Sequence, residues 1–318
     1  MSQQVTVLVP TFNRANFLRE ALTCLRLQTL SKERFRVVIL DNASEDNTSS
    51  VVAEFTDLDI VYVKRPFNIG GYKNWLSATE YFDTPYFHFL SDDDLLAPYH
   101  LETVLRTMES DLDIGVSGSG AQYGRGLWEG ELGRGDLRLG DEYINKDHQQ
   151  ILWTPAAWLA SHSIASAVSI NACLFRTNIL KKISPLFEDS VFLVSDRWFM
   201  AQIGAITTCI TSPWPSCTLR VHGSNVAHGN NSIEQLSHIK RSALLTLELA
   251  KTKGVDIIRF WKDYLSENDR NDVKALIFEA YPSNTSGEIL GDWQPGYGRL
   301  DRLPIGNTMR RKIRSWLH

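Results

Sequence analysis

The 318-residue sequence predicts an α/β protein with a mostly parallel sheet flanked by helices and a helical extension at its C-terminal end. Over the first 110 residues, short runs rich in β-branched residues alternate with segments of helical periodicity, a pattern typical of βαβ units. The hydrophobic content of 43% is enough for one large core, or for one core with a smaller subdomain. An apolar run that ends abruptly in Asp92-Asp93-Asp94 indicates the edge of a buried strand.

The periodicity of each segment gives the elements of this sheet. Strands are expected at residues 5–9, 36–40, 60–64 and 86–90, and helices at residues 15–27, 44–55 and 72–81, with Ser44 as a candidate N-cap. Ligands of open parallel sheets bind at the carboxyl ends of the strands. The loops that follow the four strands are therefore expected to border a binding site; they are residues 10–14, 41–44, 65–71 and 91–94.

The second half of the chain has less regular patterns. Residues 117–140 contain many glycines with charges between them, which favours a long loop or irregular hairpin of the kind that covers sites. Residues 151–219 are expected to add a second layer. Residues 232–250 and 255–264 have helical periodicity and form the expected extension.

The acidic run predicts a metal site. Three adjacent carboxylates repel one another, and oxygen ligands of this kind hold Mg2+ or Mn2+ while leaving open positions for substrate phosphates. Asp92 and Asp94 are the candidate ligands, with Asp94 as the first choice. The alternative for Asp94 is an N-cap of the helix expected near Pro98, which leaves Asp92 and Asp93 unexplained.

A nucleotide would have to be bound without the usual glycine-rich loops. No loop contains GxGxxG or GxxxxGK[ST], so neither the dinucleotide fingerprint nor the P-loop is present in the sequence. Asp41 closes the second expected strand, where a carboxylate can accept hydrogen bonds from a ribose or a base. Asp41 is therefore a candidate nucleotide contact.

The charge and the cysteines exclude several classes of protein. The net charge of −4 argues against nucleic acid as the main partner. The four cysteines have no CxxC spacing, which disfavours a disulfide framework or structural zinc and fits a reducing cytosol. The first expected strand begins at residue 5 and leaves no room for a secretion signal. We therefore expect a cytoplasmic protein.

The last twenty residues differ from the acidic whole. Residues 299–318 contain six basic side chains and one acid, with apolar residues between them. Such a tail can lie on an anionic membrane surface, so peripheral contact with the inner face of the cell membrane is one expectation. The alternative is a solvated helix that packs its apolar side on its own domain.

Several ordered motifs resemble those of the family 2 glycosyltransferases, the large GT-A group that uses sugar nucleotides. The first four are VTVLVPTFNR, VILDNASED, NIGGYKNW and SDDD, at residues 5–14, 38–46, 68–75 and 91–94. Two later segments, SDRWF at 195–199 and LRVHGSN at 219–225, are similar to the family's acidic base segment and its late Arg-x-His motif. The resemblance covers roughly residues 5–228 and is strongest to the abequosyltransferase-like enzymes of O-antigen synthesis.

The resemblance implies a domain organisation and a reaction. Residues 1–228 would form a GT-A catalytic domain, with a nucleotide-binding half (1–115) and an acceptor-binding half (116–228), followed by a helical region with the basic tail (229–318). The reaction would be inverting, metal-dependent transfer of a sugar from a nucleoside diphosphate to a glycan, such as lipid-linked O-antigen or another surface polysaccharide. The nucleotide would be UDP by default, with dTDP or CDP as alternatives, and the metal Mn2+ or Mg2+.

The resemblance also implies roles for individual residues. His222 would join Asp94 and Asp92 at the metal, with Arg220 beside it. Asp196 would be the general base, because residues 195–199 occupy the place of the family's acidic base; the family's Glu-Asp pair appears here as Ser195-Asp196, a departure that leaves one candidate carboxylate. Trp198 would stack on the acceptor sugar. The donor would contact Pro10, Thr11, Asn13, Arg14, Asp41, Asn68, Gly70, Lys73, Asp92 and Asp93.

Each role has a structural alternative. Asp196 could form a salt bridge to Arg197, His222 could be a satisfied structural histidine, and Asn68 with Gly70 could simply make a turn. The function has alternatives as well. A catalytically silent sugar-nucleotide-binding subunit would keep the same residues, whereas a nucleotidyltransferase would need a glycine-rich loop after the first strand, which residues 10–14 lack.

Overall fold

The computed structural model describes residues 3–125, 150–164, 168–222 and 233–257. Within these ranges the strands form one nine-stranded sheet in the order β3-β2-β1-β4-β8-β6-β9-β5, with β7 paired to β9. The strands are β1 (Val5–Thr11), β2 (Phe35–Asp41), β3 (Ile60–Lys64), β4 (Tyr86–Phe89), β5 (Leu95–Leu96), β6 (Ile114–Arg125), β7 (Ile151–Trp153), β8 (Cys173–Arg176) and β9 (Thr208–Val221). The predicted α/β class is confirmed.

The first four strands form the parallel part of the sheet. β1 pairs in parallel with β2 and β4, and β2 pairs in parallel with β3. These are the four strands that the sequence predicts. The rest of the sheet is mixed, because β8 runs antiparallel to both β4 and β6, whereas β6 and β9 are parallel.

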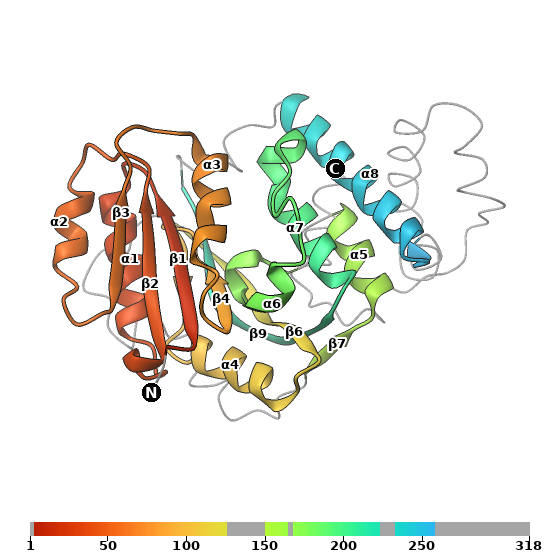
Figure 1. Ribbon diagram of the computed structural model, residues 1–318, viewed down its shortest axis with the longest axis horizontal. Coiled ribbons are helices and arrows are strands. Elements are labelled where there is room, and N and C mark those ends of the chain that lie inside the picture. The colour runs from red at the N-terminus through yellow and green to blue at the C-terminus, as the bar shows by residue number, and fades with distance from the viewer. Residues whose placement is uncertain (1–2, 126–149, 165–167, 223–232, 258–318) are drawn as a thin grey trace.

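Helices cover the sheet, as Figure 1 shows. The helices among the described residues are α1 (Ala15–Arg26), α2 (Thr48–Ala53), α3 (Gly71–Leu76), α4 (His100–Ser110), α5 (Pro155–Ile164), α6 (Thr177–Leu180), α7 (Ser195–Gly204) and α8 (Ile233–Thr252). The predicted helix at 232–250 is confirmed as α8, which packs against α5 and α7. The helix predicted at 255–264 and the basic tail lie outside the described residues, apart from 255–257.

Two apolar clusters lie on opposite sides of the sheet. Val5, Val7 and Val9 of β1 pack with residues of α1 and α4. Leu8, on the opposite face of the same strand, packs with Phe87 of β4 and with residues of α5 and α7. Every residue of β1 is buried, which is expected where a parallel sheet is covered on both faces.

The structure corrects two boundaries that the sequence suggested. α2 begins at Thr48 rather than at Ser44, because the Asp46 carboxylate accepts hydrogen bonds from the amide and hydroxyl of Thr48. Ser44 is not the N-cap; its hydroxyl accepts a hydrogen bond from the Asn13 amide (2.8 Å). It therefore connects two loops at the edge of the sheet.

The second correction concerns the glycine-rich segment. Residues 117–125 belong to strand β6 and not to a loop or irregular hairpin, and the rest of the predicted segment lies outside the described residues. A Cβ at Gly118 would lie 2.6 Å from the Cys173 sulfur of β8. Glycine therefore permits close contact between neighbouring strands, a use that glycine content alone does not distinguish from a loop.

None of the helices within the described ranges is long and apolar enough to span a membrane.

Candidate active site

The acidic run forms a tight turn between β4 and β5, at the carboxyl edge of the parallel strands. Just after β4, the Leu90 amide donates to the Leu8 carbonyl in β1 (3.0 Å), and the Asp94 amide donates to the Ser91 carbonyl (3.2 Å). Leu95 then begins β5, which pairs with β9. The turn is thus held between an early strand and a late strand of the chain.

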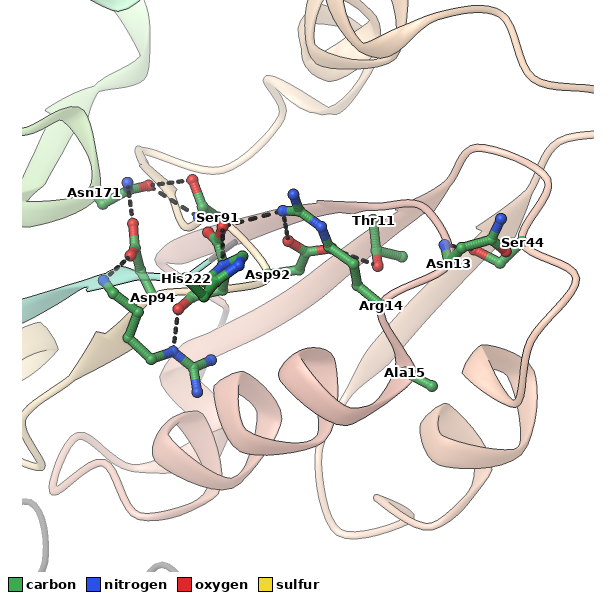
Figure 2. A network of polar contacts seen from close by, with 12 residues as sticks. Thr11, Asn13, Arg14, Ala15, Ser44, Ser91, Asp92, Asp94, Asn171 and His222 are labelled. Atoms are coloured by element: carbon green, nitrogen blue, oxygen red, sulfur yellow. Dashed lines mark hydrogen bonds and ion pairs between the residues drawn. The ribbon is translucent and has the colours of Figure 1, made fainter. Parts of the chain in front are cut away.

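Asp92 and Asp93 face the loop that follows β1. The Thr11 hydroxyl donates to Asp92 (2.7 Å), and the Arg14 guanidinium contacts Asp92 at 3.1 Å and Asp93 at 3.0 Å. Figure 2 shows Arg14 extending to the turn from the start of α1. The carboxylates of the acidic run are buried, so each of these charged contacts is stronger than it would be in water.

Asp93 also contacts the late Arg-x-His motif. The His222 Nε2 atom lies 3.1 Å from the Asp93 carboxylate, and the imidazole stacks on Phe17 with ring centroids 4.2 Å apart. The Arg220 guanidinium donates to the Asp93 carbonyl and pairs with Glu20 of α1. The structure therefore brings His222 and the acidic turn together, although about 130 residues separate them.

Asp94 lies on the other side of the turn. Its two carboxylate oxygens accept hydrogen bonds from the Asn171 side-chain amide (2.6 Å) and from the Arg220 backbone amide (2.9 Å). Asn171 also accepts hydrogen bonds from the amide and hydroxyl of Ser91 (2.9 and 3.2 Å). Both oxygens of Asp94 thus hold the turn to β9 and to the segment just before β8.

The electrostatics of the turn favour an added positive charge. Burial and the Asp93 carboxylate raise the pKa of Asp92 to about 7, although Arg14 and Thr11 stabilise its charged form. Burial and Asp93 also raise the pKa of Asp94 well above its ordinary value. A cation at the turn would stabilise the ionised carboxylates and reverse both shifts.

Asp93 and His222 are the pair whose arrangement best fits a divalent cation. A carboxylate oxygen and an imidazole nitrogen lie next to each other here, and both are ligands of Mn2+. Within the part of the chain that the structure describes, no three His, Cys, Asp or Glu side chains are grouped to hold a metal ion. An ion at this pair would need further ligands from a substrate, and phosphate oxygens suit that role.

The predicted nucleoside contacts lie along the ends of β1 and β2. Asp41 is fully buried, and its carboxylate accepts hydrogen bonds from the Ser44 amide (2.8 Å) and the Tyr62 hydroxyl. Burial and the hydrogen bond to Asp41 raise the pKa of Tyr62 to about 12, so the phenol stays a donor. Asn13 has a φ of 53°, and its side chain accepts a hydrogen bond from the Glu45 amide (2.8 Å).

The loop after β3 is joined to the loop after β2. The Asn68 side-chain oxygen accepts hydrogen bonds from Asn42 (2.7 Å) and from the Gly70 amide (2.8 Å). Gly70 has a φ of 87°, a left-handed conformation that favours glycine. Pro10 is buried in β1, whereas Lys73 is exposed on α3. The turn that the sequence allowed at Asn68 and Gly70 is present, at the same edge as Asp41.

The predicted base lies at the beginning of α7. Asp196 is in the first turn of this helix, and burial raises the pKa of its carboxyl although the neighbouring Arg197 charge opposes the shift. Trp198 packs against a small apolar cluster of Val191, Val194 and Ile239. Its indole therefore contacts α8 and the turn before α7.

Sequence reasoning missed four residues that hold the site together: Phe17, Glu20, Tyr62 and Asn171. Phe17 and Glu20 follow Arg14 at intervals of three residues, a spacing that places them on neighbouring positions of one helix face. That periodicity was a usable signal once Arg14 had been assigned to the site. Asn171 had no such signal, because only the strand order shows that β8 lies beside β4.

The family model for glycosyl transferase family 2 matches residues 6–183, more than half of the chain. An uncharacterized glycosyltransferase of Haemophilus influenzae is 21% identical over 302 residues, which are 88% of this chain and 86% of that protein. Abequosyltransferase RfbV of Salmonella typhimurium is 26% identical over 113 residues, 35% of this chain and 34% of that protein.

Solved structures share the fold. TarS 1-349 of S. aureus in complex with UDP-GlcNAc has a TM-score of 0.57 at 14% identity, covering 88% of this chain and 82% of that one. Mannosyltransferase PcManGT of Pyrobaculum calidifontis, in complex with GDP-Man and Mn2+, has a TM-score of 0.53 at 16% identity, covering 100% of this chain and 85% of that one. The chain belongs to glycosyl transferase family 2 and is a glycosyltransferase with the GT-A fold.

Proposed function

We propose that this glycosyltransferase is inverting and metal-dependent, and that it transfers a sugar from a nucleoside diphosphate to a hydroxyl of a glycan. One observation carries the proposal. Side chains from the end of β1 and the loop after it (Thr11 and Arg14), from the acidic turn (Asp92 and Asp93) and from the end of β9 (His222) converge at the carboxyl edge of the sheet. Such an edge is where ligands of open α/β sheets bind.

The diphosphate would lie against Asp93 and His222. These two side chains would hold Mn2+ or Mg2+, and the bound ion would offset the negative charge of the departing diphosphate. We assign Asp93 to this role in place of Asp94, because the Asp93 carboxylate lies 3.1 Å from the His222 imidazole, whereas the Asp94 carboxylate faces Asn171 and the Arg220 amide. Arg14 would add a positive charge close to the phosphates.

The nucleoside would lie over the ends of β1, β2 and β3. Asp41 would accept a hydrogen bond from the base or the ribose, with its carboxylate held by Tyr62 and Ser44. Asn13, Asn68, Gly70 and Lys73 would line the same edge, with Pro10 beneath. TarS with UDP-GlcNAc and PcManGT with GDP-Man support a nucleotide-sugar donor, and UDP, dTDP and CDP all stay open.

Asp196 would take the proton from the attacking hydroxyl. Burial raises the pKa of this carboxyl, which brings it closer to the pKa range in which a general base works well. Attack by the hydroxyl oxygen on the anomeric carbon breaks the bond to the diphosphate oxygen, and the proton passes to a carboxylate oxygen of Asp196. A base on the face opposite the leaving group gives inversion.

The acceptor would be a glycan or a lipid-linked glycan. Support comes from the names of two matching proteins of Salmonella typhimurium, abequosyltransferase RfbV and O-antigen chain rhamnosyltransferase RfbN. Trp198, two residues after Asp196, would contribute to binding of the acceptor. The basic tail at 299–318, which lies outside the described residues, would hold the enzyme at the inner face of an anionic membrane.

A panel of UDP-, dTDP-, CDP- and GDP-sugars, each incubated with and without Mn2+, tests the proposal. We expect one donor to release its nucleoside diphosphate only with the metal, and Asp93→Asn and Asp196→Asn to abolish that release. Asp113→Asn, an exposed carboxylate at the start of β6, is the matched control and should leave release unchanged. Metal-independent release, or full activity in both site variants, would contradict the mechanism.

A further inference from the structure

Helix α1 presents one face to the acidic turn and to the late motif together. Arg14, Phe17 and Glu20 follow one another at three-residue intervals, beginning at the N-cap of α1, so they occupy adjacent positions along one side of the helix. Arg14 contacts Asp92 and Asp93. Phe17 and Glu20 contact the other half of the site, at the end of β9.

Phe17 contacts two side chains of the late motif. Its ring stacks on His222 at 4.2 Å with an interplanar angle of 27°, and the Arg220 guanidinium carbon lies 4.8 Å from its centroid. Phe17 is half-buried and belongs to neither of the two large apolar clusters of the sheet. Its aromatic face is therefore used at the site rather than in the core.

Glu20 fixes the neighbouring residue of the motif. Its carboxylate pairs with the buried Arg220 guanidinium, which also donates to the Asp93 carbonyl. The Arg220 side chain is buried. A buried charge of this kind needs a partner, so Glu20 holds Arg220 and the backbone that leads to His222.

We propose that Phe17 and Glu20 are positioning residues that clamp the Arg220–His222 end of β9 onto α1, so that the His222 imidazole faces Asp93 at the metal site. The inference rests on the proposed metal role of Asp93 and His222, and it extends that role to a helix that does not touch the metal. Groups that orient a ligating histidine commonly change metal affinity by about ten- to a hundredfold when they are removed.

The first test needs no metal and no substrate. In the metal-free protein, the ring protons of His222, assigned by comparison with His222→Gln, should be shifted upfield by the Phe17 ring current. Phe17→Leu should remove this shift and Phe17→Tyr should keep it. Ring protons that do not respond to Phe17→Leu would overturn the clamp.

The second test measures binding of Mn2+ alone by electron paramagnetic resonance of the free ion. Phe17→Leu and Glu20→Gln should each weaken binding about tenfold or more, with Phe17→Tyr restoring it. Arg19→Gln is the control, because Arg19 lies on the same helix and pairs with Glu54 in an exposed contact. Thermal unfolding of each variant establishes that the chain is folded.

The outcomes separate this inference from the proposed function. Mn2+ binding that is normal in the wild type and unchanged in both Phe17→Leu and Glu20→Gln would overturn the clamp alone. A wild-type chain that binds no Mn2+ would overturn the proposed metal site, and the clamp's effect on metal affinity with it.

Discussion

The three carboxylates of the acidic turn differ in their surroundings, although they are identical in chemistry and adjacent in sequence. Asp92 faces Thr11 and Arg14, Asp93 faces Arg14 and His222, and Asp94 faces Asn171 and a backbone amide. Sequence reasoning predicted that the run is a site, but it could not assign the oxygens because their partners come from distant parts of the chain. The sequence prediction of Asp94 as first metal ligand stays untested, and the geometry favours Asp93.

Substitution of each carboxylate should therefore have a different result. Asp93→Asn should lower kcat by about a hundredfold or more, the usual cost of losing charge stabilisation in the transition state. Its Tm should fall less than that of Asp94→Asn, because loss of the Arg14 ion pair is offset by relief of the repulsion with Asp92 and Asp94. Asp94→Asn should lower Tm as well, because its oxygens hold β8 and β9 to the turn. Steady-state kinetics and calorimetry of both variants check this, and equal losses of Tm would contradict it.

The pH dependence of transfer should report Asp196. A base acts in its deprotonated form, so activity is lost as the pH falls through its pKa. Burial raises that pKa, so the acid limb of kcat should lie above the value of about 4 typical of an exposed aspartate. Asp196→Glu should still lose activity at acid pH. Asp189→Asn, at an exposed position, should leave the pH of this loss unchanged. A limb near pH 4 would show that Asp196 is not the base.

At the scale of elements, the junction of β4 with α4 contains a buried pair of histidines. The Nε2 atoms of His88 and His100 lie 3.0 Å apart, and His100 Nδ1 lies 2.7 Å from the Ser216 hydroxyl of β9. Burial lowers the pKa of His100 to about 3, and burial together with His100 lowers that of His88. Both rings are therefore neutral in the folded chain.

This pair should make the fold sensitive to acid. The unfolded chain binds protons at these rings below about pH 6.5 and the folded chain does not, so the free energy of unfolding falls as the pH falls from 6.5 toward 3. Between pH 6.5 and 5, His100 should account for roughly 1–2 kcal/mol of the loss, and His88 should contribute in the same direction. Urea unfolding at both pH values checks this, and His100→Asn should show a smaller decrease than the wild type.

The helices and strands show which parts of the fold local sequence patterns can predict. The four parallel strands and α1 were predictable because β-branched runs and the leucine spacing of α1 are local properties. β6 was not, because its glycines pack against β8 and the reason lies in a neighbouring strand. The start of α2 was missed for a similar reason, since the Ser44 hydroxyl accepts a hydrogen bond from Asn13, in the loop after β1, instead of capping the helix.

At the scale of the whole molecule, the two predicted halves share one sheet and one site. Asn171, from the predicted acceptor half, is the side chain that joins β8 to the acidic turn of the nucleotide half. The order of the motifs along the chain predicted the convergence of the early loops, since parallel strands end at one edge. The strand order β4-β8-β6-β9, which brings Asn171 and His222 there, was not predictable from periodicity.

Asn171 should therefore be important to both stability and activity. Asn171→Asp would place a carboxylate against Asp94 without a donor between them, and it should lower both Tm and kcat strongly because the charge is buried. Asn178→Asp is the matched control, since Asn178 is exposed on α6. Thermal unfolding and donor turnover of the two variants check the expectation; similar values for both would contradict it.

The long sequence separation between the acidic turn and its partners at the end of β9 has a consequence for when the chain gains activity during folding. Loop closure of this length is slow compared with formation of local helices, and the partners of Asp93 and Asp94 include residues at the end of β9. A refolding chain can regain most of its helical signal and its early parallel strands before His222 and Asn171 arrive. Competence to bind the donor should then appear as the final event of folding, after the spectroscopic signals of secondary structure have recovered.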